Sequence, residues 1–171
     1  YVLLATVCDV MPLRKLNKLI ASHVIRNFQI NDNLAFKFIF DQFKIKKKIT
    51  VEDLGFLIGP IINSGGRLGF SNYGTDILTS DNHDVIKKKS LKLISLNNKR
   101  KQLEKNILDN INFEKIKKEN KKVIIYYDQN MNEGLIGIIA SRLKDYFNKP
   151  SIVITKSNNI LKASARSTVN F

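Results

Sequence analysis

Three polar groups in the first 70 residues have types and spacing that could bind a metal ion or a phosphate. The first is Asp9, which directly follows the apolar run Val2–Cys8. That run is short, continuous and partly β-branched, which predicts a strand buried on both faces. A carboxylate at the carboxyl end of such a strand lies where open α/β sheets bind their ligands. The alternative interpretation is that Asp9 merely caps the following helix.

The other two groups are Asn63 and Arg67, four residues apart in the glycine-rich segment 59–69. Glycines allow a ligand to approach the backbone closely. An amide and a guanidinium fork at this spacing could bind one phosphate together. The alternative is the end of a helix with a surface arginine.

Two later segments carry weaker signals. Segment 132–144 predicts an amphipathic helix that starts near Gly134, and the free amides of its first turn could face an anion. Segment 162–167, which contains Ser164 and Arg166, is by itself typical of an ordinary strand with an exposed arginine.

Helices are predicted to position the first groups. Apolar residues at three- and four-residue spacing predict helices over 13–28 and 33–43. Thr50 and Asp53 form a capping-box pattern at the start of a third helix. Gly59-Pro60 should disturb that helix and Gly65-Gly66 should end it, before a short helix over 71–79.

The rest of the chain predicts a connector and a second α/β unit. Asp81 opens about 30 helical residues with one apolar stripe, which predicts a connecting helix and, alternatively, a coiled-coil dimer. Strands are predicted over 123–128, 151–155 and 160–166, with a helix over 135–147 between the first two. This order is a βαβ unit followed by a hairpin.

The composition is strongly basic. The chain has 171 residues, with 29 Lys and Arg against 15 Asp and Glu, and a net charge of +14. Such an excess favours nucleic acid, although abundant Lys, Asn and Ile are also typical of an AT-rich genome. The single Cys8 fits a reducing cytoplasm, and no apolar run is long enough for a membrane span. Because Tyr1 lies inside a predicted strand, we expect a fragment of a longer chain.

Four segments, taken together, resemble the RecJ exonucleases of the DHH phosphoesterase superfamily. Segment 5–13, ATVCDVMPL, resembles the family's ATVADVVPL, and 59–68, GPIINSGGRL, resembles GPRLNAAGRL. Segment 131–144, MNEGLIGIIASRLK, resembles WHxGVIGIVASRLK, and 163–167, ASARS, resembles GSGRS. They occur in the family's order and span nearly the whole chain.

The resemblance implies an α/β fold in three parts. Residues 1–80 would be the C-terminal part of a DHH phosphoesterase domain, 81–120 a connecting helix, and 121–171 the start of a DHHA1-type nucleic-acid-binding domain. It also implies a 5′-to-3′ exonuclease of single-stranded DNA that depends on Mg²⁺ or Mn²⁺, works in DNA repair and recombination, and is cytoplasmic and monomeric.

The resemblance also assigns roles to residues. Asp9 would be a catalytic metal ligand, and Asn63, Arg67, Ser164 and Arg166 would bind phosphates. The contributions of Asn132, Arg142 and Ser167 stay open.

Departures from the family pattern keep alternatives open. Asn132 replaces a His, so it cannot titrate near neutral pH, and Ala163 and Ala165 replace glycines, so their Cβ atoms could obstruct a phosphate. The family's Asp-His-His metal motifs would lie upstream of Tyr1, so the chain alone should be inactive. One alternative is a DHH-family phosphatase of oligonucleotides or a nucleoside bisphosphate; another is a decayed relative that only binds nucleic acid.

Overall fold

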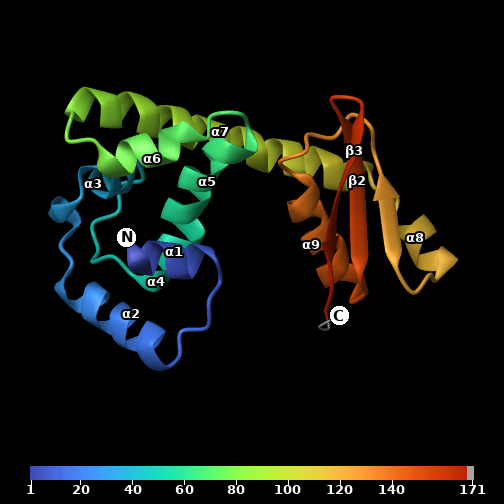
Figure 1. Cartoon of the computed structure of the whole chain (residues 1–171), viewed down its shortest axis with the longest axis horizontal. Helices are drawn as coiled ribbons and strands as arrows, with labels where there is room; N and C mark the ends of the chain where they lie inside the picture. Colours follow the sequence, from blue (N-terminus) through green and yellow to red (C-terminus); the bar gives the residue numbers. More distant parts are fainter. Residues whose placement is uncertain (169–171) are drawn as a thin grey trace. The chain divides into compact units, whose positions relative to one another are not determined.

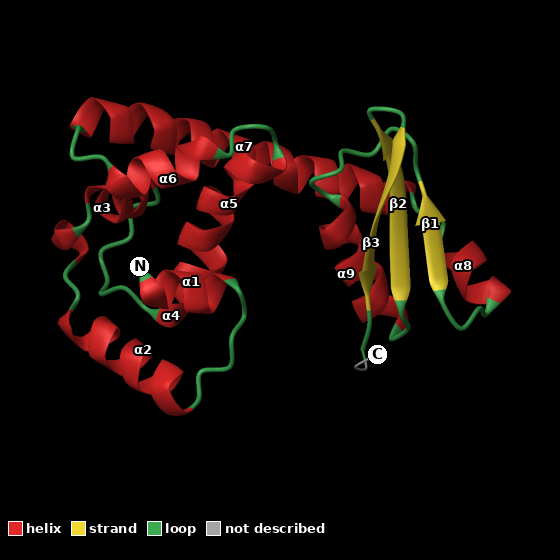
Figure 2. Cartoon of the chain, in the orientation of Figure 1, coloured by secondary structure: helices red, strands yellow, loops and turns green. Residues whose placement is uncertain are grey.

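The computed structural model describes residues 1–168 and divides the chain into two units, Tyr1–Asn97 and Asn98–Phe171 (Figure 1). Each unit has its own apolar core. Mixed helices and strands confirm the predicted α/β class (Figure 2). None of the helices in the described residues combines the length and apolar character needed to cross a bilayer.

Unit 1 is helical throughout. Its elements are α1 (Val2–Cys8), α2 (Lys15–Asn27), the 3₁₀ turn η1 (Ile30–Asp32), α3 (Leu34–Gln42), α4 (Val51–Asp53), the π-helical turn η2 (Leu54–Ile58), α5 (Gly59–Arg67), α6 (Asn72–Thr79) and the first part of α7 (His83–Asn110). The core is filled by fully buried side chains from five of them, among them Ile39, Phe40, Ile58, Ile61, Ile77 and Leu93. These elements hold the segments around Asp9, Asn63 and Arg67 in one unit.

The predicted strand before Asp9 is wrong, because Val2–Cys8 forms helix α1. Leu3 and Leu4 are buried while Val7 and Cys8 are half-buried. Positions i, i+1, i+4 and i+5 share one helix face, whereas a strand buried on both faces would bury every residue. Periodicity cannot separate these two structures in so short an apolar run.

Local signals in the next helices are confirmed. The Thr50 hydroxyl accepts from the Asp53 backbone N–H, and the Thr50 N–H donates to the Asp53 carboxylate at 2.9 Å. The disturbance expected at Gly59-Pro60 is the π-helical turn η2, which directly precedes it. Proline lacks an N–H and clashes with the carbonyl four residues earlier, so a widened turn accommodates it.

The long helix α7 contributes to both cores. Its apolar stripe includes Ile86 and Leu93, buried in unit 1, and Ile107, which packs against the core of unit 2. The division between the units falls after Asn97, inside the helix. The predicted connector is interrupted, however, because the Asn112 side chain accepts from the Lys115 N–H at 2.8 Å and starts a separate helix, α8 (Phe113–Glu119).

The second unit contains the predicted βαβ unit and hairpin. Strands β1 (Ile124–Tyr127) and β2 (Ser151–Ser157) are parallel, and β2 and β3 (Ile160–Arg166) are antiparallel. Helix α9 (Ile136–Phe147) contacts both β2 and β3. In the register, Val153 pairs with Ser164, so Ser164 lies on the same sheet face as a fully buried residue. This face is covered by α9.

Candidate nucleic-acid interface

Ser164 and Arg166 lie together at the first turn of α9. An Arg166 Nη1–H donates to Ser164 Oγ at 3.1 Å and to the Ala165 carbonyl at 2.7 Å. A Cβ added to Gly137 would lie 3.2 Å from Arg166 Nη2 and 3.3 Å from Ser164 Oγ. The absence of a side chain at Gly137 therefore lets a hydroxyl and a guanidinium group approach the start of this helix. Hydroxyl, guanidinium and helix N-terminal groups are the kinds that bind phosphate.

The loop before α9 is joined to the same strand by an ion pair. Glu133 contacts Lys162 at 2.5 Å, two residues before Ser164. Hydrogen bonds from Lys162 and Ser157 lower the pKa of the Glu133 carboxyl, since they stabilise its charged form. Next to it, Asn132 Oδ1 accepts from the Gly134 N–H at 2.9 Å, so the side chain that replaces the family's histidine supports a local turn. The structure thus brings the Asn132 segment and the Ser164 segment together.

Ala163 and Ala165 lie on the other face of the sheet. They pair with Ile154 and Ile152 in the β2–β3 register and alternate with Ser164 along β3. Side chains of successive strand residues point to opposite faces. Their Cβ atoms therefore point away from the sheet face that carries Ser164 and is covered by α9.

Arg142 lies in a different environment. Its Nε–H donates to Glu104 of α7 at 2.8 Å, and its side chain is 60% exposed. Its partner Glu104 lies on α7, whereas Ser164 and Arg166 lie together on β3. Ser167 follows the end of β3 directly and is half-buried.

Asn63 and Arg67 occupy one stripe of α5. Successive turns of the helix carry Gly59, Asn63 and Arg67. Asn63 is exposed and Arg67 is half-buried. Gly66, between them, has open space where a Cβ would lie, with no atom within 4 Å. This stripe carries an amide and a guanidinium group on one side of α5.

Asp9 follows Cys8, whose side chain packs against Gly59 on the same stripe of α5. A Cβ on Gly59 would lie 2.5 Å from Cys8 Sγ, so the end of α1 packs directly against the start of α5. This burial, with the charge of Asp9 as a smaller cause, raises the pKa of the Cys8 thiol. Asp9 itself is the C-cap of α1, and its N–H donates to the Ala5 carbonyl at 2.9 Å. Asp9 therefore caps the helix that precedes it, which neither interpretation of the sequence anticipated.

The backbone after Asp9 is strained. Val10 has a φ of 55° and is 86% exposed. A left-handed conformation costs a β-branched residue about 1–2 kcal/mol relative to its usual regions. Lys15 and Lys44 also have a left-handed φ, so this conformation is not confined to the surroundings of Asp9.

The residues described here can supply only part of a metal site. Carboxylate oxygens suit Mg²⁺ and Mn²⁺, and Asp9 is an exposed carboxylate. Within residues 1–168, however, no group of three or more His, Cys, Asp or Glu side chains could hold an ion. Residues 1–168 therefore contain no complete metal site.

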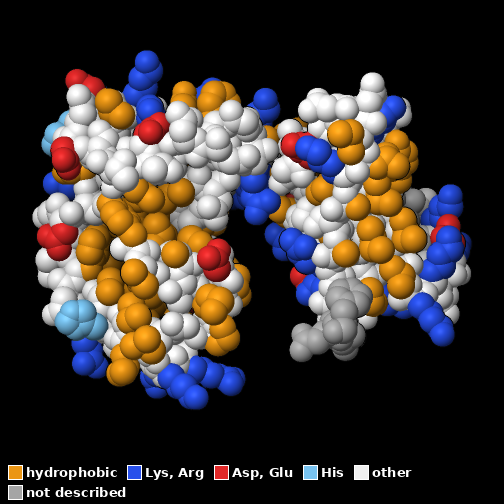
Figure 3. Space-filling view, viewed as in Figure 1, with side chains coloured by type: hydrophobic (Ala, Val, Ile, Leu, Met, Phe, Trp, Pro, Cys, Tyr) orange, Lys and Arg blue, Asp and Glu red, His pale blue; other side chains and the backbone are white. Residues whose placement is uncertain are grey.

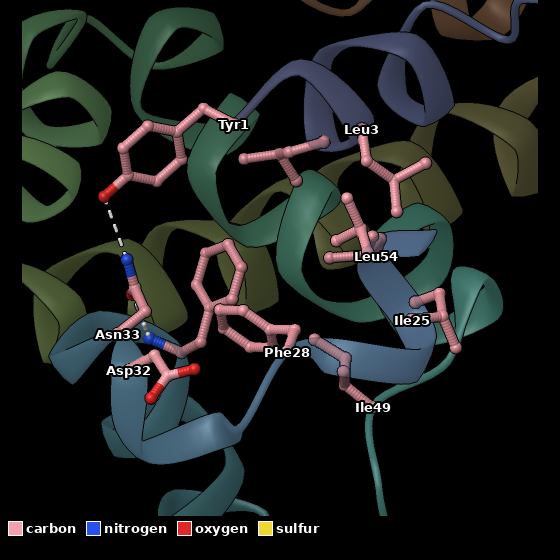
Figure 4. Close-up of a pocket in the computed structure, with 11 residues that line it drawn as sticks. Tyr1, Leu3, Ile25, Phe28, Asp32, Asn33, Ile49 and Leu54 are labelled. Atoms are coloured by element: carbon pink, nitrogen blue, oxygen red, sulfur yellow. Dashed lines mark hydrogen bonds between the residues drawn. The ribbon is translucent and has the colours of Figure 1, made fainter. Parts of the chain in front are cut away.

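A cavity of about 300 Å³ lies elsewhere in unit 1 (Figure 4). Its wall is mostly apolar and includes Leu3, Phe28 and Leu54, while the Tyr1 hydroxyl accepts from Asn33 Nδ2 at 2.9 Å at its polar edge. None of the residues predicted to bind metal or phosphate lines it. The cavity is not the candidate site.

Comparison with solved structures gives the class of fold first. The chain superposes on a crystal structure of RecJ in complex with Mn²⁺ from Thermus thermophilus with a TM-score of 0.80 and 22% identity, covering 96% of this chain and 24% of the other. A crystal structure of exonuclease RecJ bound to manganese gives a TM-score of 0.77 at 22% identity, covering 98% and 41% of the two chains. The fold is that of these segments of RecJ.

Sequence comparison then gives the particular relatives. The chain is 31% identical to the single-stranded-DNA-specific exonuclease RecJ of Haemophilus influenzae, over 97% of this chain and 30% of the relative. It is 26% identical to RecJ of Bacillus subtilis, over 98% of this chain and 22% of the relative. No protein-family model matches the chain. The chain is RecJ-like over nearly its whole length, and it spans less than a third of these relatives.

Sequence reasoning missed three contributors to these clusters. Gly137 and Glu133 become visible only when β3 is placed against α9. The position of Glu104 could have been recognised in the sequence. It is the one acidic residue in the basic stretch 99–105, and it lies three and seven residues before the apolar positions 107 and 111. Such spacing puts a charged residue on a buried helix face.

Proposed function

We propose that this chain is part of a RecJ-like exonuclease that degrades single-stranded DNA from 5′ to 3′ with Mg²⁺ or Mn²⁺. The complete protein acts in DNA repair and recombination as a cytoplasmic monomer. Similarity to RecJ along 97% of the chain supports the assignment. The observation that carries it is the convergence of Ser164 and Arg166 on the glycine at the start of α9. This arrangement suits a phosphodiester backbone and reads no base sequence.

In this proposal the two units have separate tasks. Asp9 contributes one carboxylate to a metal site whose other ligands come from the rest of the protein. The metal ions would supply charge stabilisation at the scissile phosphate and an activated water. Asn63 and Arg67 bind a phosphate near Asp9, and Ser164 and Arg166 bind the backbone of the strand in the second unit.

Arg166 provides the test. Arg166→Ala in the complete protein should raise the KM for single-stranded DNA about tenfold, since a charge-assisted hydrogen bond to phosphate contributes roughly 1.5 kcal/mol or more. The kcat should change little. The matched control is Lys156→Ala, which removes a basic side chain of β2 outside the cluster. An unchanged KM in Arg166→Ala, or no metal-dependent cleavage of single-stranded DNA by the complete protein, would contradict the proposal.

A nucleic-acid-binding protein without catalytic activity is the second candidate. It is favoured by Asn132, whose side-chain oxygen is engaged in a turn and cannot exchange a proton near neutral pH. The two candidates differ in one measurement. With Mn²⁺ present, a protein that only binds would leave the length of bound single-stranded DNA unchanged, whereas an exonuclease would shorten it and release nucleotides.

A further inference from the structure

A buried carboxylate in unit 2 serves two arginines at once. Glu104 of α7 has a side chain that is only 9% exposed. Its Oε2 contacts Arg100 Nη1 at 2.9 Å and its Oε1 contacts Arg142 Nε at 2.8 Å. One negative charge therefore faces two positive charges, and the group as a whole carries an excess of +1.

The two arginines differ in exposure. The Arg100 side chain is 13% exposed, so it compensates the buried charge of Glu104 from within the unit. The Arg142 side chain is 60% exposed, although its Nε–H is bound to the same carboxylate. The Nε contact fixes the orientation of the planar guanidinium group, while its two Nη groups take no part in the contact. An oriented, exposed guanidinium presents two donors in a geometry that matches a phosphate.

The surroundings favour an anion as the ligand. Lys101 and Lys105 flank Glu104 on α7, and both are exposed. Figure 3 shows Lys and Arg side chains at several places on the surface of this unit.

We propose that Glu104 is a positioning residue that holds Arg142 as a further contact for a backbone phosphate of single-stranded DNA. This inference rests on the proposed function and adds a contact separate from Ser164 and Arg166. Glu104 does not touch the nucleic acid; it acts by fixing the plane of the Arg142 guanidinium group. Lysine at position 142 cannot replace it, since a lysine has no Nε–H beside two further donor groups.

Binding of a fluorescein-labelled oligothymidylate to the complete protein in EDTA, at several salt concentrations, tests the proposal. Arg142→Gln should weaken binding about fivefold and reduce the slope of log K against log salt by about 0.7, the value for one phosphate contact on a single strand. Arg142→Lys should keep the slope but lose part of the affinity. Glu104→Gln should weaken binding to a smaller extent.

The double variant separates positioning from a structural role. In the Arg142→Gln background, Glu104→Gln should cause no further loss of binding, although each substitution lowers thermal stability. Additive losses in binding would mean that Glu104 does not act through Arg142. Unchanged binding and slope in Arg142→Gln, with a lowered melting temperature, would make the cluster a structural link between α7 and α9 and overturn the proposal. Retained sensitivity to Arg166→Ala would show that the proposed function itself still holds.

Discussion

The contact between Gly59 and Cys8 makes a prediction about how Asp9 is positioned. An alanine at position 59 would place its Cβ 2.5 Å from Cys8 Sγ and 2.8 Å from the Leu54 carbonyl oxygen. Both distances are shorter than real Cβ contacts, so the Cys8 side chain or the end of α1 must shift, and the Leu54 carbonyl, a backbone atom of η2, must shift as well. Overpacking of this kind costs about 1–3 kcal/mol, whereas replacing a helical glycine by alanine gains about 0.5–1 kcal/mol. Gly59→Ala should therefore destabilise the protein by about 1–2 kcal/mol.

Gly66 provides the matched control in the same helix. Its Cβ would meet nothing within 4 Å, so Gly66→Ala should stabilise the protein by about 0.5–1 kcal/mol. Urea unfolding of the two variants beside the unsubstituted chain measures both values. The two substitutions are chemically identical, and their difference of about 2 kcal/mol comes only from the neighbours that each Cβ meets.

A second substitution identifies the contact responsible. Cys8→Ala removes the sulfur atom and should recover part of the stability lost in Gly59→Ala, while the contact with the Leu54 carbonyl remains. In the complete protein, Gly59→Ala should also reduce turnover, because a displaced α1 displaces Asp9. Equal stabilities of Gly59→Ala and Gly66→Ala would refute the packing argument and, with it, the claim that Gly59 sets the position of Asp9.

Three further predictions concern the site and the core. Asp9→Asn in the complete protein should abolish turnover at saturating Mn²⁺ and leave binding of single-stranded DNA within about twofold, since one carboxylate is lost and the basic surface is unchanged; near-normal turnover would remove Asp9 from the metal site. Arg67→Lys should lower the rate of cleavage although charge is conserved, whereas Lys88→Gln on the exposed side of α7 should alter only the salt dependence; equal rates at matched ionic strength would make Arg67 a helix-end residue. Ser90→Ala should stabilise the protein by about 1 kcal/mol, because the buried Ser90 hydroxyl oxygen has no hydrogen-bond partner in the structure and the methyl group needs none; a lower midpoint in urea would contradict this.

Several elements could be predicted from the sequence because their causes are local. The capping box of Thr50 and Asp53 needs only residues three apart. The distortion before Pro60 follows from the missing N–H and the proline ring. The βαβ unit and the hairpin followed from short β-branched runs, a helical period and turn residues between them.

Other features depended on tertiary structure. The run Val2–Cys8 forms a helix whose Leu3, Leu4, Val7 and Cys8 side chains pack against the core of unit 1. The sequence of so short a run does not show whether one face or two will be buried. The predicted connector ends before Asn112 because the side-chain oxygen of Asn112 accepts a hydrogen bond from the Lys115 N–H and caps α8, instead of facing water.

The candidate site divides in the same way. Which groups could bind phosphate can be read from the residue types alone, since an amide, a hydroxyl or a guanidinium has the same chemistry wherever it lies. Which of these groups lie together depends on how the elements pack. Strand β3 brings Ser164 and Arg166 to Gly137, which is 27 residues from Ser164 along the chain. Arg142 pairs with Glu104 of α7 across 38 residues. Pairings at such separations arise from packing between elements, and they cannot be inferred from the residues adjacent in the sequence.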